Sequence, residues 1–244
     1  MKNKYNGFYL MGNYPDKETF IKSALEGLRY FDFIEVGIPF SDPIADGEVI
    51  SDAAQFMIEK NEGFAEISKS IEYIREHSDK SKDIYLMTYS NLIYNMNMKD
   101  FNDFCTGVNV KGLILPDVPF CEQSFIRQLN LDDNIALINF LTPESTQESL
   151  EEITSEAKGF IYFISMRGIT GSKFTMEDET VSILKKATSL SNVPVVTGFG
   201  IKSKEDAKMA LNYSDGFITG TALIEALKEG GFDSFKSKLR EFFE

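Results

Sequence analysis

The chain has 244 residues, of which 43% are apolar and 13% aromatic, so it can bury a substantial core and is not a disordered protein. It carries 25 basic and 38 acidic side chains, a formal net charge of −13. This charge argues against nucleic acid or an anionic membrane as the main partner, because both attract a basic surface. A phosphorylated ligand is still compatible with it, since clustered backbone N–H groups can hold an anion on an acidic protein.

The few cysteines and the single histidine narrow the possible chemistry. Cys105 and Cys121 have neither a disulfide-framework spacing nor a metal-ligand spacing, which is typical of ordinary thiols in a cytosolic protein. His77 lies in the polar stretch "REHSDKSKD", so no Ser–His or Cys–His pair and no histidine-based metal site can form. We therefore expect no metal, and proton transfer by Asp, Glu, Tyr or Lys. No signal-peptide or membrane-spanning pattern is present, and we expect a cytoplasmic protein.

Eight short apolar runs alternate with segments of helical period along the chain. The runs are continuously apolar, which is typical of strands covered on both faces of a parallel sheet. They occupy residues 7–12, 33–37, 84–89, 112–117, 134–140, 159–165, 193–200 and 215–220. Between them, stretches such as "ETFIKSALEGLRY" carry one apolar stripe. Thr142 with Pro143, and Ser203 with Asp206, predict the starts of two of the helices.

This alternation, without any linker-like stretch, predicts an α/β fold: a single-domain (β/α)8 TIM barrel over residues 1–244, with a minimal N-terminal extension before the first strand. A doubly wound open sheet is the alternative. The second and third strands start 51 residues apart, at 33 and 84, and the sixth and seventh 34 apart, at 159 and 193. Because the loops that follow barrel strands lie on the face where active sites are built, the long connections after strands two and six are where we expect function.

The first of these long connections begins with the acidic stretch "IEVGIPFSDPIADGEVI", residues 34–50. Glu35 lies within a predicted strand, where a carboxylate is costly unless it is paired or used. One interpretation is structural: Glu35 pairs with a lysine or arginine, and Asp46 belongs to an ordinary turn. The other is catalytic: one carboxylate transfers protons while the other stays an anion. The shortage of histidine favours the catalytic interpretation.

Glycine-bearing turns follow the last three predicted strands. They are "GITG" (168–171), "GFG" (198–200) and "ITGTALIEAL" (218–227), the last of which runs directly into a helix. Glycine lets the backbone approach a ligand closely, and the first N–H groups of a helix attract anions. Each turn alone could be an ordinary helix cap or tight turn. Three such turns after consecutive strands, however, predict a phosphate site.

The stretch "FIEVGIPFSDPIADGEVI" resembles the signature of the tryptophan synthase alpha chain family. Further similar segments follow in the family's order: "LMTYSN", "LILPDVP", "YFISMRGITG", "PVVTGFGI" and "SDGFITGTAL". The resemblance implies a lyase of tryptophan biosynthesis that cleaves indole-3-glycerol phosphate to indole and glyceraldehyde 3-phosphate by a retro-aldol reaction. It also implies a complex of two alpha and two beta chains, with no cofactor in this chain and pyridoxal phosphate in the beta chain.

The resemblance also implies roles for individual residues. Glu35 matches the acid–base residue, and Asp46 matches the carboxylate that accepts the indole N–H. Positions that match substrate-binding residues are Phe8, Leu86, Tyr162, Thr170, Gly171, Phe199, Gly200, Gly220 and Thr221. Pro39, Asp42 and Asn91 are expected at the interface with the beta chain, with Phe40 as an exposed docking side chain.

Several departures from the family pattern are visible in the sequence. Among them, the N-terminal helix that usually covers the barrel floor is missing or minimal, and Glu48 stands where proline is common. Two other functions stay open: another phosphate-binding barrel isomerase or synthase, and a catalytically weak regulatory partner of a beta chain.

Overall fold

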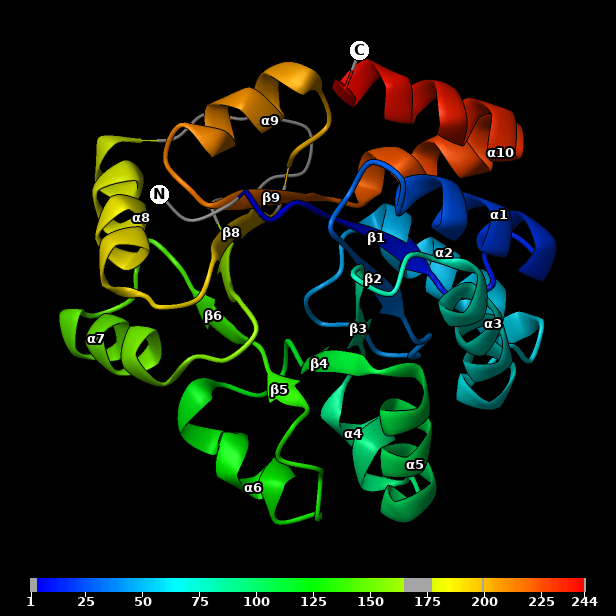
Figure 1. Ribbon diagram of the computed structural model, residues 1–244, viewed down its shortest axis with the longest axis horizontal. Helices are drawn as coiled ribbons and strands as arrows, with labels where there is room; N and C mark the ends of the chain where they lie inside the picture. Colours follow the sequence, from blue (N-terminus) through cyan, green and yellow to red (C-terminus); the bar gives the residue numbers. More distant parts are fainter. Residues whose placement is uncertain (1–3, 165–176, 199, 244) are drawn as a thin grey trace.

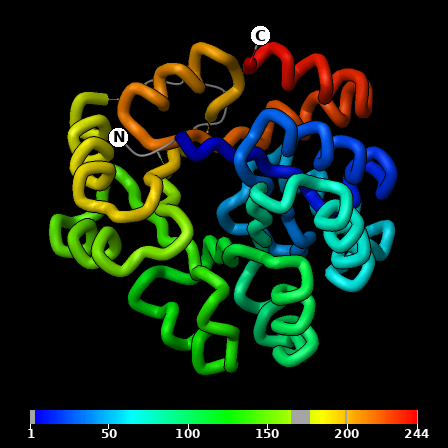
Figure 2. Tube along the Cα trace, in the orientation of Figure 1, coloured from blue at the N-terminus to red at the C-terminus, as the bar shows by residue number. Residues whose placement is uncertain are grey.

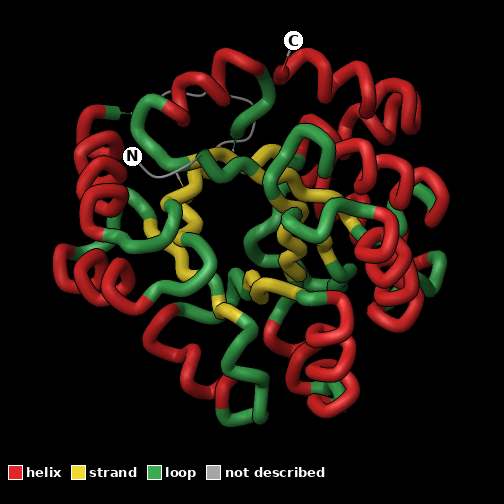
Figure 3. Tube along the Cα trace, viewed as in Figure 1, coloured by secondary structure: helices red, strands yellow, loops and turns green. Residues whose placement is uncertain are grey.

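The computed structural model describes residues 4–164, 177–198 and 200–243. In these residues parallel strands form an inner ring and helices form an outer ring (Figures 1 and 3). The chain passes once around the ring, and its first strand pairs with its last (Figure 2). The strands are β1 Gly7–Met11, β2 Phe33–Gly37, β3 Asp83–Met87, β4 Val110–Ile114, β5 Ala136–Leu137, β6 Asn139–Leu141, β7 Ile161–Ile164, β8 Val195–Gly198 and β9 Gly216–Thr219.

The order of the strands confirms the barrel prediction. Neighbours in the sheet run β5-β4-β3-β2-β1-β9-β8-β7-β6, and all the pairs are parallel. The predicted fifth strand is divided into β5 and β6, which Ile138 separates. The Ile138 N–H still donates to the Leu113 carbonyl of β4 at 2.9 Å. The ring closes through this residue. A doubly wound sheet would reverse its strand order at a switch point, so that alternative is wrong.

The outer helices bury one face. They are α1 Lys17–Gly27, α2 Glu48–Glu59, α3 Phe64–His77, α4 Ser90–Tyr94, α5 Met98–Val108, the short 3-10 helix η1 Phe120–Glu122, α6 Gln123–Arg127, α7 Gln147–Glu156, α8 Asp178–Leu190, α9 Lys204–Leu211 and α10 Thr221–Phe243. Side-chain caps start α1, α5, α7 and α9. Ser203 and Asp206 cap α9 reciprocally, as predicted. The predicted start at Thr142 is wrong: Thr142 opens a turn closed by Ser145, and Thr146 caps α7.

Side chains alternate between two apolar layers along each strand. One layer packs inside the ring and contains Phe33, Tyr85, Ile114, Ala136, Ile138, Phe160, Tyr162, Val196 and Ile218. The other lies between strands and helices and includes Phe8, Leu10, Ile34, Val36, Leu86 and Leu113. Because both faces of the strands are largely buried, the strands read as mostly apolar runs in the sequence.

Tyr5 fills the floor of the barrel, at the N-terminal ends of the strands. Its ring stacks on Phe33 with centroids 4.6 Å apart. Its hydroxyl donates to the Asp83 carboxylate at 2.7 Å and shares a 2.9 Å hydrogen bond with the Tyr85 hydroxyl. A Cβ on Gly216 would lie 1.8 Å from the Tyr5 carbonyl oxygen, so glycine there admits this segment. The described part of the N-terminal extension, residues 4–6, is not helical. The floor of the barrel is instead covered by the Tyr5 ring.

Candidate active site at the carboxyl ends of the strands

Glu35 lies in the middle of β2, with its side chain inside the barrel. It pairs in register with Tyr9 of β1 and Tyr85 of β3. Only 1% of the residue is exposed, and within the described residues its Oε1 has no hydrogen-bond partner. Burial raises the pKa of the Glu35 carboxyl from 4.5 to about 8, and no charged group among the described residues offsets this shift. The structural interpretation of Glu35, a paired carboxylate, is therefore wrong: this group is kept mostly protonated at neutral pH.

Asp46 lies above Glu35, in the loop between β2 and α2. Partial burial raises the pKa of its carboxyl from 3.8 to about 6, and a hydrogen bond from the Tyr89 hydroxyl opposes this shift. At neutral pH Asp46 is therefore mostly ionised while Glu35 is mostly protonated. The two carboxyl groups differ in charge because Glu35 is fully buried without a donor, whereas Asp46 is partly solvated and hydrogen-bonded.

Tyr89 holds the acidic loop in place from the end of β3. Its hydroxyl donates to Asp46 and accepts a hydrogen bond from the Ala45 N–H at 3.1 Å. Its ring stacks on Phe40, with centroids 5.0 Å apart and planes 23° from parallel. Phe40 is therefore half-buried, and its prediction as an exposed docking side chain is wrong. Tyr89 lies in the family-like segment "LMTYSN" but was not among the predicted site residues.

Two tyrosines face the carboxyl groups from β1 and β7. Burial, then Asp46, then Glu35 raise the pKa of the Tyr9 phenol; burial, then Glu35, then Asp46 raise that of Tyr162. Three strands and the loop after β2 therefore bring these two tyrosines within electrostatic reach of Glu35 and Asp46. Tyr162 was among the predicted substrate-binding residues, whereas Tyr9 was not.

Phe8 and Leu86 do not lie in this interior, contrary to the sequence prediction. Phe8 faces α1, where a Cβ on Gly27 would lie 2.4 Å from its ring, and its ring is 5.0 Å from that of Phe31. Leu86 pairs in register with Val36 and belongs to the layer between strands and helices. The reason is the two-residue period of a strand: Tyr9 and Glu35 point inward, so their neighbours point outward.

Two of the three predicted phosphate turns lie beside this group. Gly200 follows β8 with a φ of 83°, and Gly220 separates β9 from Thr221, the first residue of α10. The Thr219 hydroxyl donates to the Ile201 carbonyl at 2.8 Å and so ties the two turns together. The first N–H groups of α10 have no carbonyl within their own helix, which makes them suitable for an anion. Thr170, Gly171 and Phe199 lie outside the described residues.

The predicted partner residues are dispersed over the same face. Asp42 is exposed and accepts a 2.7 Å hydrogen bond from the Ser41 hydroxyl, and Asn91 is exposed on α4. Pro39 is buried. Two large apolar side chains near them are exposed, Ile44 at 78% and Tyr94 at 51%. The outer part of the acidic loop and α4 thus present a partly apolar surface.

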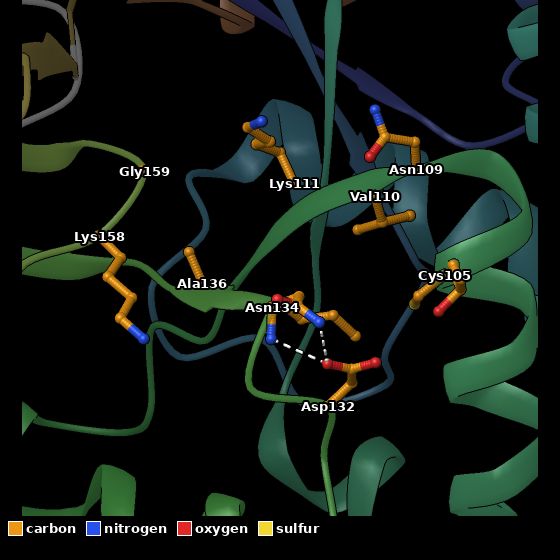
Figure 4. A pocket seen from close by; sticks show the side chains of 11 residues that line it. Cys105, Asn109, Val110, Lys111, Asp132, Asn134, Ala136, Lys158 and Gly159 are labelled. Atoms are coloured by element: carbon orange, nitrogen blue, oxygen red, sulfur yellow. Dashed lines mark hydrogen bonds between the residues drawn. The ribbon is translucent and has the colours of Figure 1, made fainter.

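A separate cavity of about 380 Å³ is lined by residues at the N-terminal ends of β4 and β5, some of which Figure 4 labels. Its lining includes Val110 of β4 and Ala136 of β5, together with Lys111 and Asp132. Asp132 accepts hydrogen bonds at 2.9 Å from both the backbone and side-chain N–H groups of Asn134, so it caps the turn before β5. Neither Glu35 nor Asp46 lines this cavity, and catalysis is not expected there. Among the described residues no cluster of His, Cys, Asp and Glu could hold a metal ion.

The chain matches known proteins over nearly its whole length. The family described as tryptophan synthase alpha chain matches residues 2–242. The tryptophan synthase alpha chain of Caldicellulosiruptor bescii is 34% identical over 243 residues, covering 99% of this chain and 90% of that protein. That of Leptospira biflexa is 35% identical over 245 residues, with 97% and 90% covered.

Solved structures agree with these matches. One, of the tryptophan synthase alpha2beta2 complex from Pyrococcus furiosus, superposes with a TM-score of 0.87 at 28% identity and covers 99% of both chains. Another, from Aquifex aeolicus, gives a TM-score of 0.86 at 27% identity, covering 98% of this chain and 92% of that one. The chain belongs to the tryptophan synthase alpha chain family.

Proposed function

We propose that the chain cleaves indole-3-glycerol phosphate to indole and glyceraldehyde 3-phosphate. One observation supports this function above others: a buried, protonated Glu35 and an ionised Asp46 share one barrel mouth beside two glycine turns. A retro-aldol cleavage that expels an indole needs both an acid for ring carbon C3 and an anion for the ring nitrogen. Another barrel isomerase or synthase would need the glycine turns but not this acid–anion pair.

The proposed sequence of steps begins with Glu35 protonated. Its proton passes to C3 of the indole ring, and the positive charge that develops on the ring is stabilised by the Asp46 carboxylate, which accepts the indole N–H. The Glu35 carboxylate then takes the proton of the hydroxyl on the adjoining carbon. As that C–O bond becomes a C=O bond, the C–C bond breaks and its electron pair returns to the ring. Neutral indole and the aldehyde form, and Glu35 is again protonated.

The rest of the site would position the substrate. Gly171, Gly200, Gly220 and Thr221 are proposed to hold the phosphate, and Tyr162, Thr170 and Phe199 to contact the rest of the molecule. The support for the described part is the hydrogen bond between Thr219 and Ile201, together with the start of α10, where the first N–H groups of a helix have no carbonyl partner within that helix. None of these steps uses a cofactor in this chain, and we assign it none.

A tryptophan synthase beta chain is the proposed partner, in a complex of two alpha and two beta chains. The solved structure of the Pyrococcus furiosus alpha2beta2 complex concerns the mutual activation of that complex. Asp42 and Asn91, with Pro39 behind them, are proposed at the interface. The support is structural continuity: the loop that bears Asp42 also bears Asp46, and Tyr89 hydrogen-bonds to both Asp46 and Ala45. Docking on its outer part would therefore fix the catalytic anion.

We further propose one domain over residues 1–244 and a cytoplasmic location, with pyridoxal phosphate confined to the beta chain. Within the described residues no helix is both long enough and apolar enough to cross a bilayer.

Indole release from indole-3-glycerol phosphate, measured with and without a beta chain, tests the proposal. We expect stoichiometric indole and glyceraldehyde 3-phosphate, a rate that rises with the beta chain, and little turnover of the unphosphorylated indole glycerol. In Asp42→Ala we expect the beta-chain-dependent rise to be lost while the activity of the free chain persists. No indole under any condition would contradict the lyase function; stimulation of a beta chain without cleavage would indicate the purely regulatory function.

A further inference from the structure

Tyr9 places a phenol hydroxyl within electrostatic reach of both carboxyl groups. The residue is 4% exposed and lies at the middle of β1, in register with Glu35. A Cβ on Gly37 would lie 2.1 Å from the Tyr9 hydroxyl oxygen, and a Cβ on Gly220 would lie 3.0 Å from the Tyr9 Cβ. The side chain therefore extends from the turn before α10 to the end of β2, with its hydroxyl in the space that a side chain at position 37 would fill.

This hydroxyl has no strong acceptor in the described structure. Its partner is the Met11 sulfur at 3.9 Å, and a thioether accepts only weak hydrogen bonds. Burial and the charges of Asp46 and Glu35 raise the pKa of the phenol, so it stays protonated and remains a donor throughout the neutral range. A buried donor of this kind is costly unless a ligand supplies the acceptor.

The position of the ring indicates which substrate atom that acceptor is. Under the proposed function, the phosphate lies at the start of α10 and the indole nitrogen at Asp46. The glycerol chain that joins them must then pass over Tyr9. The Tyr9 Cβ lies beside Gly220, and its hydroxyl lies beside Gly37, two residues after Glu35 on the same side of β2. The oxygen that Glu35 deprotonates lies next to the indole ring, at the Glu35 end of this path.

We infer that the Tyr9 hydroxyl is a further catalytic group, which donates a hydrogen bond to the substrate oxygen that becomes the aldehyde oxygen. The inference rests on the proposed function. As the hydroxyl proton moves to Glu35 and the C–C bond breaks, negative charge develops on this oxygen before the C=O bond is complete. The phenol stabilises that charge and keeps its own proton, so the balance of protons in the reaction is unchanged.

The requirement for glycine at position 37 follows from the same geometry. A methyl group there would occupy the position of the Tyr9 hydroxyl. Gly37→Ala therefore displaces the donor without changing either carboxyl group or Tyr9 itself, and serves as a second, independent variant.

The test compares Tyr9→Phe with wild type in steady-state cleavage of indole-3-glycerol phosphate, in the presence of a beta chain. We expect kcat to fall about 10- to 100-fold, because one donor to a developing oxyanion is lost, and KM to change less than about threefold. The dissociation constant of 3-(indol-3-yl)propyl phosphate, which lacks the chain hydroxyls, should be unchanged. Gly37→Ala should also lower kcat, as Tyr9→Phe does.

Tyr5→Phe is the matched control. It also removes one buried phenol hydroxyl from the barrel, but at the floor, where the partners are Asp83 and Tyr85. It should lower the thermal stability and leave kcat within about twofold of wild type. A folded Tyr9→Phe with wild-type kcat would overturn the inference, as would a rise in KM alone or weaker binding of the propyl phosphate. If the wild type releases no indole, the proposed function fails, which is a different result.

Discussion

Replacing Glu35 by glutamine should stabilise the protein at neutral and alkaline pH, even though it removes the proposed acid. The pKa of this carboxyl is about 8 in the folded chain, against 4.5 for an unburied glutamate. Below pH 4.5 both states hold the proton, and the ionisation of Glu35 costs the wild type nothing. Between pH 4.5 and 8 only the unfolded chain ionises, so the wild type loses about 1.4 kcal/mol of unfolding free energy per pH unit.

The resulting penalty is about 3 kcal/mol at pH 7 and levels off near 5 kcal/mol above pH 8, where the folded chain ionises too. Glutamine has nearly the same shape and no charge, so its variant escapes this loss. Between pH 5 and 7 the stability difference between variant and wild type should grow by roughly 2–3 kcal/mol, equivalent to about 5–10 °C in Tm for a chain of this size.

Urea unfolding followed by circular dichroism at closely spaced pH values measures this difference, with Glu229→Gln as a control at an exposed glutamate of α10. The Glu229 control should follow the wild-type pH dependence. If the Glu35→Gln stability curve ran parallel to that of wild type from pH 5 to 9, Glu35 would not have a raised pKa, and its proposed role as an acid at neutral pH would lose its basis.

Two further predictions concern catalysis. The pH profile of kcat/KM should fall below about pH 6, as Asp46 becomes protonated, and above about pH 8, as Glu35 loses its proton. Because the Tyr89 hydrogen bond lowers the pKa of Asp46, Tyr89→Phe should move the acidic limb of the profile to higher pH. If the limb did not move, the acidic limb would not report the protonation of Asp46. Gly220→Val should raise KM for indole-3-glycerol phosphate at least about tenfold, with a smaller effect on kcat, because phosphate is held alike in ground and transition states. Full activity of this variant at low substrate concentration would contradict the phosphate site.

The barrel and the position of the acid could be predicted from sequence because Glu35 is a polar marker in an otherwise apolar run. It fixes which side of β2 faces the interior, and the long loop after it marks the functional face. β1 carries no such marker, and the charged residue of β3, Asp83, comes just before the predicted strand of residues 84–89. In the middle of both strands neighbouring side chains are all apolar or aromatic, so the sequence pattern cannot say which of two neighbours points inward.

Phe8 and Leu86 were assigned to the pocket from the family resemblance, and the apolar pattern of their strands could neither exclude them nor indicate Tyr9. The register with Glu35, which only the structure provides, assigns the interior to Tyr9. Tyr89 was missed for a different reason: its contacts with Asp46, Ala45 and Phe40 join loops far apart in sequence. The same stacking turns Phe40 inward, whereas its place between two prolines had indicated an exposed side chain.

The kinetics of Glu35→Gln with indole-3-glycerol phosphate test the proposed chemistry most directly. The amide keeps the shape of the side chain but can neither protonate C3 nor accept the hydroxyl proton. The expected result is a loss of kcat of at least about 1000-fold, while the dissociation constant of the substrate, measured by calorimetry on the folded variant, stays within about threefold of wild type. A variant that retained more than about a tenth of the wild-type kcat would show that Glu35 is not the acid–base residue of this barrel.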